Sequence, residues 1–234
     1  MSVGEVPVIL QARMGSHRLP AKVLAPIAGR PLVEHCIARL VAAGVGPVWL
    51  ATTVGPGDDC LAEMAGRLGV RVVRGPEDDV LQRFGLVADY LEARYFIRAT
   101  ADNPAVDIGA PARVIDVIDA SGADYVVEQA LPVGAAVEAV RTAALFQAMA
   151  QARDPYDREH VTPYLYRTPR RFRALTPLAP EPLRRPDLRL TVDTGEDLAF
   201  IRAVLGQAAP AGELAPLSAI IRAADAIRRP GRVA

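Results

Sequence analysis

The sequence is poor in the residues from which several common functional sites are built. Its 234 residues include two cysteines, three histidines and a single lysine. The histidines are too scattered to form a metal cluster by spacing, and Cys36 and Cys60 each fall in a helical pattern. Such cysteines are typical of small core residues in a reducing compartment, rather than of a disulfide or a zinc site.

Long apolar runs and an excess of one charge are also missing. The formal net charge is 0, whereas nucleic-acid-binding proteins usually carry a net basic face. There is no secretory signal and no run of about 18 apolar residues of the kind that spans a membrane. We therefore expect a cytoplasmic protein that binds neither nucleic acid nor membranes.

Several well-known motifs are absent as well. The sequence contains no GxxxxGK[ST], GxGxxG, HExxH, CxxC or GxSxG. A P-loop, a dinucleotide-binding turn, a zinc protease, a dithiol redox site and a serine-hydrolase elbow are therefore unsupported.

The most informative stretch present is 6–31, near the start of the chain. Its first five residues are mostly apolar and predict a buried strand. The loop that follows carries Gln11, Arg13, Arg18 and Lys22, and its glycine and proline favour an irregular conformation. Of the 27 lysine and arginine residues, Lys22 is the one lysine. Since an ammonium is a compact charge suited to phosphate, we interpret this loop as a phosphate-binding loop rather than an ordinary surface loop.

Apolar periodicity alternates between strand and helix along the first half of the chain. It predicts strands at 48–51, 70–73, 95–100 and 124–127, and helices at 32–41, 58–68, 80–91 and 108–120. This order predicts an α/β fold with a mainly parallel sheet, helices on both faces, and one domain of ordinary size. Thr52, the turn 74–79 and Asp102 follow three of the strands, so they should share the ligand-binding edge.

The pattern weakens between 129 and 187. We expect an edge strand within 133–140, helices at 141–153 and 158–167, and an insertion over 129–187 that covers the site or forms a dimer contact. Residues 189–193 predict another buried strand, and 217–228 a final helix. Asp58 should cap the helix at 58–68, and Thr194 with Asp197 resembles a capping box.

Two carboxylates, Asp102 and Asp193, come at the ends of predicted strands. Oxygen ligands on a rigid frame suit Mg²⁺, which commonly takes one or two protein carboxylates together with substrate phosphates and water. Taken singly, Asp102 is equally typical of a turn and Asp193 of a helix cap. Facing a basic loop, the pair favours a metal site for nucleoside triphosphate chemistry.

The motifs together resemble those of the cytidylyltransferases that activate acidic sugars. They are QARMGS at 11–16, RLPAKVL at 18–24, GRPL at 29–32, TT at 52–53, RGPEDDVL at 74–81, RATADNP at 98–104, EHVTPY at 159–164 and RLTVDT at 189–194. The chain is most similar to the spore-coat-polysaccharide type, which is related to the synthetases of CMP-Kdo, CMP-sialic acid and CMP-pseudaminic acid. The resemblance spans about residues 6–205.

This resemblance implies a nucleotide-diphospho-sugar transferase-like fold and transfer of CMP from CTP to a small anionic acceptor, with release of pyrophosphate. It also implies Mg²⁺ and a homodimer. The implied roles are as follows: Arg13, Lys22 and Asp102 are catalytic; Gln11, Arg13, Arg18, Lys22, Thr52 and Asp78 bind the nucleotide; Arg98 and Glu138 bind the acceptor; and Asp102 and Asp193 bind the metal.

The sequence departs from the family pattern at three positions. Ala21 stands where many relatives have glycine, and alanine there would cost stability if the position needs a positive φ. His17 replaces a common serine or threonine. Ala136 stands where relatives often have aspartate. If that aspartate contacts the acceptor, either a different acceptor or poor catalysis is implied.

Two other functions fit parts of the pattern. A glycosyltransferase of the same fold would use a preformed nucleotide-sugar, but the sequence contains no Asp-x-Asp motif. A non-catalytic nucleotide-binding paralogue would agree with Ala136, whereas the presence of Lys22, Asp102 and Asp193 argues against it.

Overall fold

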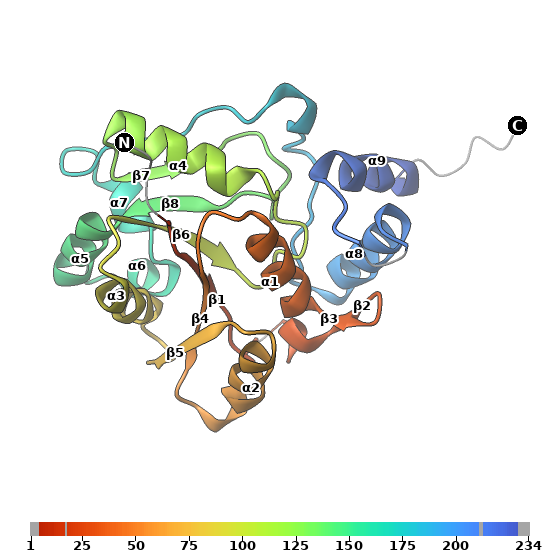
Figure 1. Cartoon of the computed structure of the whole chain (residues 1–234), viewed down its shortest axis with the longest axis horizontal. Helices are drawn as coiled ribbons and strands as arrows, with labels where there is room; N and C mark the ends of the chain where they lie inside the picture. The colour runs from red at the N-terminus through yellow and green to blue at the C-terminus, as the bar shows by residue number, and fades with distance from the viewer. Residues whose placement is uncertain (1–4, 17, 211–212, 229–234) are drawn as a thin grey trace, which may run out of the picture.

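The computed structural model describes residues 5–16, 18–210 and 213–228, and its centre is a seven-stranded sheet (Figure 1). The strands run in the order β5-β4-β1-β6-β8-β7-β9. Their bounds are β1 (Val8–Gln11), β4 (Val48–Thr53), β5 (Arg71–Gly75), β6 (Tyr95–Thr100), β7 (Tyr125–Val127), β8 (Glu138–Arg141) and β9 (Ala174–Leu175). The first four in sequence pair in parallel, and β8 is antiparallel to both of its neighbours. The expected α/β fold with a mainly parallel sheet is confirmed.

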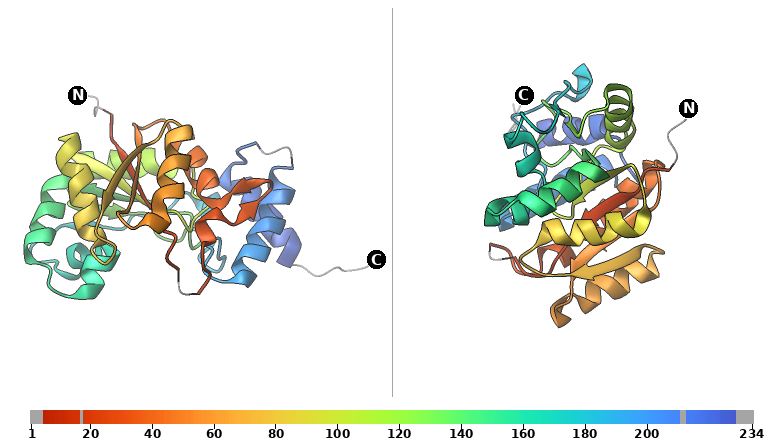
Figure 2. Two further views of the ribbon diagram at one scale, coloured as in Figure 1. Left: turned by 90° about the horizontal axis from the view of Figure 1, so that it is seen from below. Right: turned by 90° about the vertical axis from the view of Figure 1, so that its left-hand side faces the viewer.

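Helices cover both faces of this sheet (Figure 2). One face packs against α1 (Leu32–Ala42), α2 (Asp59–Arg67) and α4 (Ala110–Ser121). Helices α8 (Gly195–Ala208) and α9 (Leu217–Arg228) extend the same core and pack against each other. The other packs against α3 (Val80–Leu91), α5 (Thr142–Gln151) and α7 (Pro163–Arg167), with α6 (Pro155–His160) beside α3. Short 3₁₀ helices are η1 (Lys22–Leu24), η2 (Pro56–Asp58) and η3 (Glu181–Leu183), and β2 (Pro26–Ile27) pairs with β3 (Arg30–Pro31).

Strand β1 lies in the middle of the parallel half and joins the two cores. Val8 and Leu10 belong to the core under α1, whereas Ile9 belongs to the core under α3. All three are fully buried, because successive side chains of a strand point to opposite faces and both faces are covered. The apolar opening of the chain is therefore the central strand, and the loop that follows it leaves at the middle of the ligand-binding edge.

Several predicted elements agree closely with the structure. The strand at 95–100 and the helices at 80–91 and 217–228 have the expected bounds. Helix α8 begins with the expected capping box: Thr194 accepts a hydrogen bond from the Asp197 backbone, and the Asp197 side chain accepts one from the Thr194 backbone. These local signals act over three or four residues and therefore need no tertiary contact to be visible.

The predicted edge strand at 133–140 was wrong. The strand in this region, β8, lies inside the sheet between β6 and β7. A strand is present, at 138–141, and only its position at an edge was wrong. Glu138 of this strand forms an ion pair with Arg98 of β6. A charge neutralised by a neighbouring strand can occupy a central position, and that neighbour is forty residues away in sequence.

Residues 189–193 do not form a sheet strand, contrary to the prediction. Leu190 and Val192 are buried, but the segment makes only an isolated bridge, between Val133 and Arg189. The apolar pattern correctly indicated burial and not pairing. The predicted helix at 158–167 is likewise two short helices, α6 and α7, because Val161 between them adopts φ +72°.

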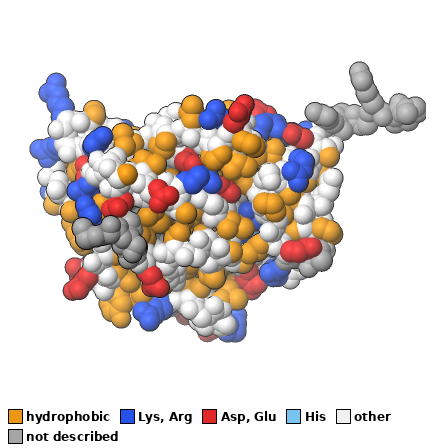
Figure 3. Space-filling model, turned by 45° about the horizontal axis from the view of Figure 1, so that its top comes forward, with side chains coloured by type: hydrophobic (Ala, Val, Ile, Leu, Met, Phe, Trp, Pro, Cys, Tyr) orange, Lys and Arg blue, Asp and Glu red, His pale blue; other side chains and the backbone are white. Residues whose placement is uncertain are grey.

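The surface shows no strong segregation of charge on the face drawn in Figure 3, where acidic and basic side chains of the described residues are interspersed. Among the helices that the structure describes, none combines the length and the hydrophobicity that crossing a membrane requires.

Candidate active site

A cleft of about 330 Å³ opens at the carboxyl ends of β1 and β6. Here the chain order reverses: β4 and β5 extend the sheet from one side of β1, and β6 from the other. Ligands of open parallel sheets bind at such a point. Among the predicted site residues, those lining the cleft are Gln11, Arg13, Arg18, Lys22, Arg98, Asp102 and Asp193.

The loop after β1 is held in place by a buried carboxylate, Asp58. Its Oδ1 accepts a hydrogen bond from the Met14 backbone (2.7 Å), and its Oδ2 accepts from the Thr53 hydroxyl (2.5 Å) and the Thr53 backbone (3.2 Å). Burial alone would raise the pKa of Asp58, but these hydrogen bonds outweigh it and lower the pKa. The expected capping role was wrong, since the Asp58 side chain makes no cap bond to α2. It instead fixes the backbone beside Arg13.

The lysine of this loop follows a residue in a left-handed conformation. Ala21 has φ 54° and ψ 25°, and immediately after it η1 begins at Lys22. An L-residue other than glycine adopts this region at a cost of about 1 kcal/mol. The sequence therefore retains strain next to the only lysine of the chain. His17, in the same loop, lies outside the described residues.

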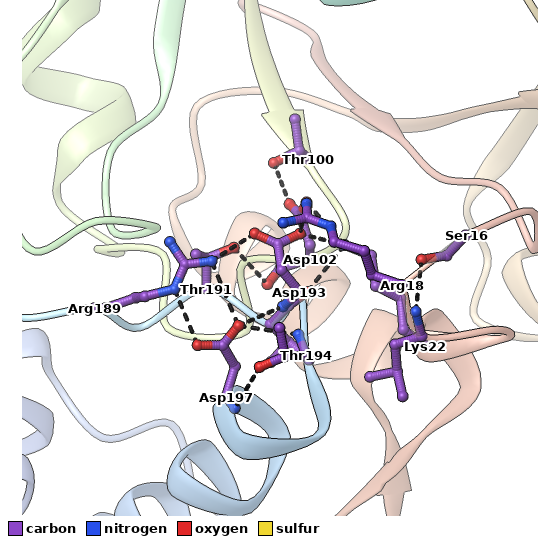
Figure 4. A network of polar contacts seen from close by, with 12 residues as sticks. Ser16, Arg18, Lys22, Thr100, Asp102, Arg189, Thr191, Asp193, Thr194 and Asp197 are labelled. Atoms are coloured by element: carbon purple, nitrogen blue, oxygen red, sulfur yellow. Dashed lines mark hydrogen bonds and ion pairs between the residues drawn. The ribbon is translucent and has the colours of Figure 1, made fainter.

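The Lys22 ammonium lies between the two predicted metal-binding carboxylates (Figure 4). Its Nζ donates to Asp102 Oδ2 (3.2 Å), to Asp193 Oδ1 (3.0 Å) and to the Val192 carbonyl (2.9 Å). The Lys22 side chain is 15% exposed. Three segments separated by 80 to 171 positions thus meet at one nitrogen.

Asp193 is the more heavily paired of the two carboxylates. Besides Lys22, Arg18 contacts Oδ1 (2.9 Å) and Arg189 contacts Oδ2 (2.6 Å). Burial would raise the pKa of Asp193, but the hydrogen bond and charge of Lys22, followed by Arg189 and Arg18, lower it. Asp193 therefore stays ionised, and Arg18, whose side chain is 67% exposed, is the partner freest to move.

Asp102 is positioned by neighbouring residues at the end of β6. The Thr100 hydroxyl donates to Asp102 Oδ1 (2.6 Å), and Asn103 donates to that hydroxyl (2.8 Å). The Asp102 carbonyl accepts from the Val192 backbone (2.8 Å), which joins β6 to the segment carrying Asp193. This backbone link, rather than a paired strand, brings the two carboxylates together.

The donor set fits a magnesium ion shared with phosphate. Both carboxylates contact the same ammonium, so a small cation between them would be within reach of both. Among the described residues there is no group of three or more acidic, histidine or cysteine side chains that could form a complete protein cage. Mg²⁺ needs no such cage, since it usually keeps water and phosphate ligands.

A second network lies behind the cleft. Arg98 Nη1 donates to Glu138 Oε2 (2.6 Å), and its Nη2 donates to Gln11 Oε1 (3.1 Å). Glu138 also accepts from the hydroxyls of Tyr125 and Thr162, so both of its oxygens are engaged. Arg98 lines the cleft and Glu138 does not. In this structure Glu138 orients Arg98 rather than facing the cleft itself.

Two further predicted residues lie away from the cleft lining. Thr52 is fully buried in β4. Asp78 lies with Arg13, Glu77 and Glu159 around an adjoining hollow of about 610 Å³. Arg13 connects the two spaces, with ion pairs to Glu77 (3.6 Å) and Glu159 (3.5 Å).

Three lining residues with ionisable side chains had no role assigned from the sequence: Arg83, Glu159 and His160. The last two precede Val161, a buried β-branched residue at φ 72° and ψ −58°, where strain of this kind often accompanies a functional site. Arg83 had a usable signal. It stands three residues after Val80 and four before Val87, on the apolar face of α3, where an arginine is unexpected.

Comparison with known proteins agrees with this geometry. The family model described as Cytidylyltransferase matches residues 7–218, and the chain belongs to this family of nucleotidyltransferases. The spore coat polysaccharide biosynthesis protein SpsF of Bacillus subtilis (strain 168) is 34% identical over 212 residues, which cover 88% of each chain.

Solved structures show the same fold. A cytidylyltransferase from Leptospira borgpetersenii has a TM-score of 0.84 at 25% identity, covering 96% of this chain and 94% of that one. The structure of CMP:2-keto-3-deoxy-manno-octonic acid synthetase complexed with CTP has a TM-score of 0.64 at 20% identity. The match covers 86% of this chain and 99% of that one. The nucleotide-diphospho-sugar transferase-like fold expected from sequence is confirmed.

The left-handed Ala21 predicts a stabilising substitution. Ala21→Gly should raise the free energy of unfolding by roughly 0.5–1 kcal/mol, because glycine adopts φ 54° without the Cβ penalty. Ala42→Gly, on an exposed helical position of α1, should lower it by a similar amount. Urea unfolding of the two variants measures the difference. A loss of stability in Ala21→Gly would contradict the assigned strain.

Asp197 predicts a dependence of stability on pH. Its carboxylate accepts from Arg189 and from the backbones of Asp193 and Thr194. Burial alone would raise its pKa, but these bonds hold the pKa at about 2, against about 3.9 when unfolded. The stabilisation is therefore complete above about pH 5 and is lost as pH falls toward 2.

Asp197→Asn should lower the free energy of unfolding at pH 7 by roughly 1–2 kcal/mol, and this deficit should shrink below about pH 4. Glu196→Gln, on the same exposed turn, should change stability by less than about 0.5 kcal/mol. Unfolding curves at pH 7, 5, 4 and 3 test this. A deficit that stays constant with pH would show that the charge of Asp197 is not its source.

Proposed function

We propose that this protein is a Mg²⁺-dependent cytidylyltransferase that transfers CMP from CTP to an acidic sugar or another small anionic acceptor and releases pyrophosphate. The observation that supports it best is one loop carrying Arg13, Arg18 and Lys22 opposite Asp102 and Asp193. Such a set offers positive charge for a triphosphate and oxygen ligands for the cation that accompanies it.

The basic side chains of the loop differ in exposure and in the number of carboxylates that they contact, and therefore in how easily a triphosphate can reach them. Arg18 is exposed and held by one carboxylate, whereas Lys22 is nearly buried between two. When phosphate oxygens enter the cleft, both side chains can exchange a carboxylate partner for a phosphate partner. That exchange frees oxygens of Asp102 and Asp193, which would hold the magnesium ion.

The transfer itself forms one bond and breaks one. An oxygen of the acceptor attacks the α-phosphorus and loses its proton. The bond from the α-phosphorus to the oxygen that bridges to the β-phosphorus breaks, and pyrophosphate leaves with the additional negative charge. Arg13, Arg18 and Lys22 stabilise that charge as it develops. Magnesium, when bound, supplies further neutralisation of the phosphate oxygens.

The acceptor end of the site is assigned to the β6–β8 side. Arg98 lines the cleft there, oriented by Glu138. The segment carrying Ala136 packs against the strand end, since a Cβ on its Gly134 would come within 2.9 Å of Asn103 Oδ1. Alanine at 136 in place of the aspartate frequent in relatives supports an acceptor that differs from the common acid sugars.

The names of the relatives support the same assignment. SpsF is a spore coat polysaccharide biosynthesis protein, and the synthetase with the same fold was solved in complex with CTP. We assign this chain to polysaccharide biosynthesis in the cytoplasm, where CTP is made, and where thiols such as its two free cysteines remain reduced.

Substitutions in the charged cluster test the function. The wild-type protein with CTP and Mg²⁺ should release pyrophosphate with one class in a panel of acid sugars, sugar phosphates and phosphonates. Lys22→Ala and Asp193→Ala should each lower kcat/KM by roughly 10²-fold or more. Arg67→Ala, an exposed arginine of α2 outside the cleft, is the matched control.

Two results would count against this function. Full activity in Lys22→Ala or Asp193→Ala would contradict the site. Tight CTP binding by the wild-type protein without pyrophosphate release on any acceptor would favour a non-catalytic paralogue.

We also propose a homodimer that uses the region 129–187. Several large apolar side chains of this region are exposed: Val133, Phe146, Tyr156, Tyr166 and Leu178. Such side chains are common at subunit interfaces.

Leu178→Asp, at a side chain 61% exposed, should shift the protein toward monomer. The equally exposed Val54→Asp, outside the region, should not. Light scattering after size-exclusion chromatography measures the molar mass. A wild-type monomer at high concentration would refute this proposal without affecting the chemistry.

A further inference from the structure

The ammonium of Lys22 lies between the two carboxylates to which the proposed function assigns the metal ion (Figure 4). Its Nζ is 3.2 Å from Asp102 Oδ2 and 3.0 Å from Asp193 Oδ1. A magnesium ion bound to either oxygen at about 2.1 Å would lie no more than about 5 Å from Nζ. Cations at that separation repel each other strongly where little water screens them. Lys22 and a divalent cation therefore compete for the same place.

The other two oxygens of these carboxylates are engaged as well. Asp102 Oδ1 accepts a hydrogen bond from the Thr100 hydroxyl (2.6 Å), and Asp193 Oδ2 accepts one from Arg189 (2.6 Å). Among the ion pairs of the described residues, those of Lys22 are the ones that reach both carboxylates. A metal ion that binds both carboxylates must therefore displace the lysine.

The contacts of Lys22 match the bonding capacity of an ammonium. Its three N–H groups have three acceptors, which are the two carboxylates and the Val192 carbonyl (2.9 Å). The Lys22 side chain is 15% exposed, so little water reaches it. Moving this charge is unfavourable unless new acceptors replace the old ones. A metal ion alone supplies no acceptor, whereas a triphosphate supplies several.

A lysine suits this position better than an arginine. The chain contains a single lysine among its 27 lysine and arginine residues. An ammonium is a compact point charge on a flexible stem, whereas a guanidinium is a planar fork. The ammonium can contact three acceptors from separate segments at one atom, as a metal ion does. Rotation of the stem can then turn the same charge toward a phosphate.

We propose that Lys22 holds the position of the divalent cation until a triphosphate draws the ammonium away, so that nucleotide and metal bind cooperatively. This inference rests on the proposed function and adds how the two ligands of the site depend on each other. Without a triphosphate, the divalent cation competes with Lys22 and binds weakly. With one, Lys22 exchanges carboxylate oxygens for phosphate oxygens, and Asp102 and Asp193 become available. By linkage, each ligand strengthens binding of the other by the same factor.

The first experiment removes the ammonium and measures metal binding without nucleotide. Electron paramagnetic resonance reports free Mn²⁺ in the presence of protein. Lys22→Met should bind Mn²⁺ at least about 10-fold more tightly than the wild-type protein. Arg13→Met removes the same charge from the same cleft but no contact to either aspartate, and it should change the affinity by less than about 3-fold. Equal affinity in Lys22→Met and wild type would overturn the proposal.

A second substitution locates the metal that Lys22→Met binds. Adding Asp193→Asn to Lys22→Met should abolish the gain in Mn²⁺ affinity, because one of the two carboxylates is then neutral. A gain that survives this change would place the metal elsewhere and refute the competition. Mg²⁺ itself is tested by thermal unfolding without nucleotide. It should raise the Tm of Lys22→Met more than that of the wild-type protein.

The single lysine also allows a test on the unaltered chain. Lysine labelled with ¹³C at Cε gives one side-chain NMR signal, which belongs to Lys22. CTP with EDTA should shift this signal, whereas Mg²⁺ without nucleotide should leave it in place. A shift caused by Mg²⁺ alone would contradict the proposal, and so would bound CTP that leaves the signal unchanged. This measurement remains decisive if Lys22→Met does not fold.

Failure of the proposed function can be told apart from failure of this inference. If the wild-type protein releases no pyrophosphate with any acceptor, the proposed function fails. The Mn²⁺ comparison contains neither nucleotide nor acceptor, so it still decides whether Lys22 excludes the metal.

Discussion

The structure depends on one shared ammonium. Lys22 Nζ contacts carboxylates from the end of β6 and from the segment before α8, and a carbonyl of that same segment. Without this charge, Asp102 and Asp193 would lose the cation that they share, and of the two only Asp193 would keep ion pairs, with Arg18 and Arg189. Repulsion between the two carboxylates would then be less well balanced. The same three groups are those to which the proposed function assigns the triphosphate and its metal ion. On that proposal, the ligands compete with the contacts that Lys22 makes here.

Charged side chains elsewhere at the site are also held by polar partners from other segments of the chain, and Arg83 differs from them. Asp58 is buried and satisfied by backbone and hydroxyl donors. Arg98 is half-buried and donates to Glu138 and Gln11, although its Nε has no partner. These pairs make the walls of the cleft rigid, which is a condition for reading a ligand. Arg83 is 1% exposed, and its Nε and Nη1 have no hydrogen-bond partner among the described residues.

The sequence predicted some residues of the candidate site and missed others. The basic loop and Asp102 were visible because each follows a strand that ends at the same edge of the parallel sheet. Asp193 was visible because it follows a buried apolar stretch, although that stretch is not a strand of the sheet. Arg83 was overlooked because it lies inside a helical pattern, although an arginine on the apolar face of α3 was a signal. The roles of Glu138 and Asp58 were not predictable in detail, since both depend on partners, such as Arg98 and Met14, that only the folded chain places beside them.

The sequence by itself determined the alternation of strands and helices, the burial of β1, the capping box of α8 and the family, because these depend on local periodicity and short motifs. The tertiary structure alone decided that β8 lies inside the sheet, that 189–193 runs extended without pairing, and that Ala21 is left-handed. It also decided that Lys22 joins two carboxylates. The physical reason is that strand pairing and charge pairing between distant residues are properties of the folded chain, and no local pattern encodes them.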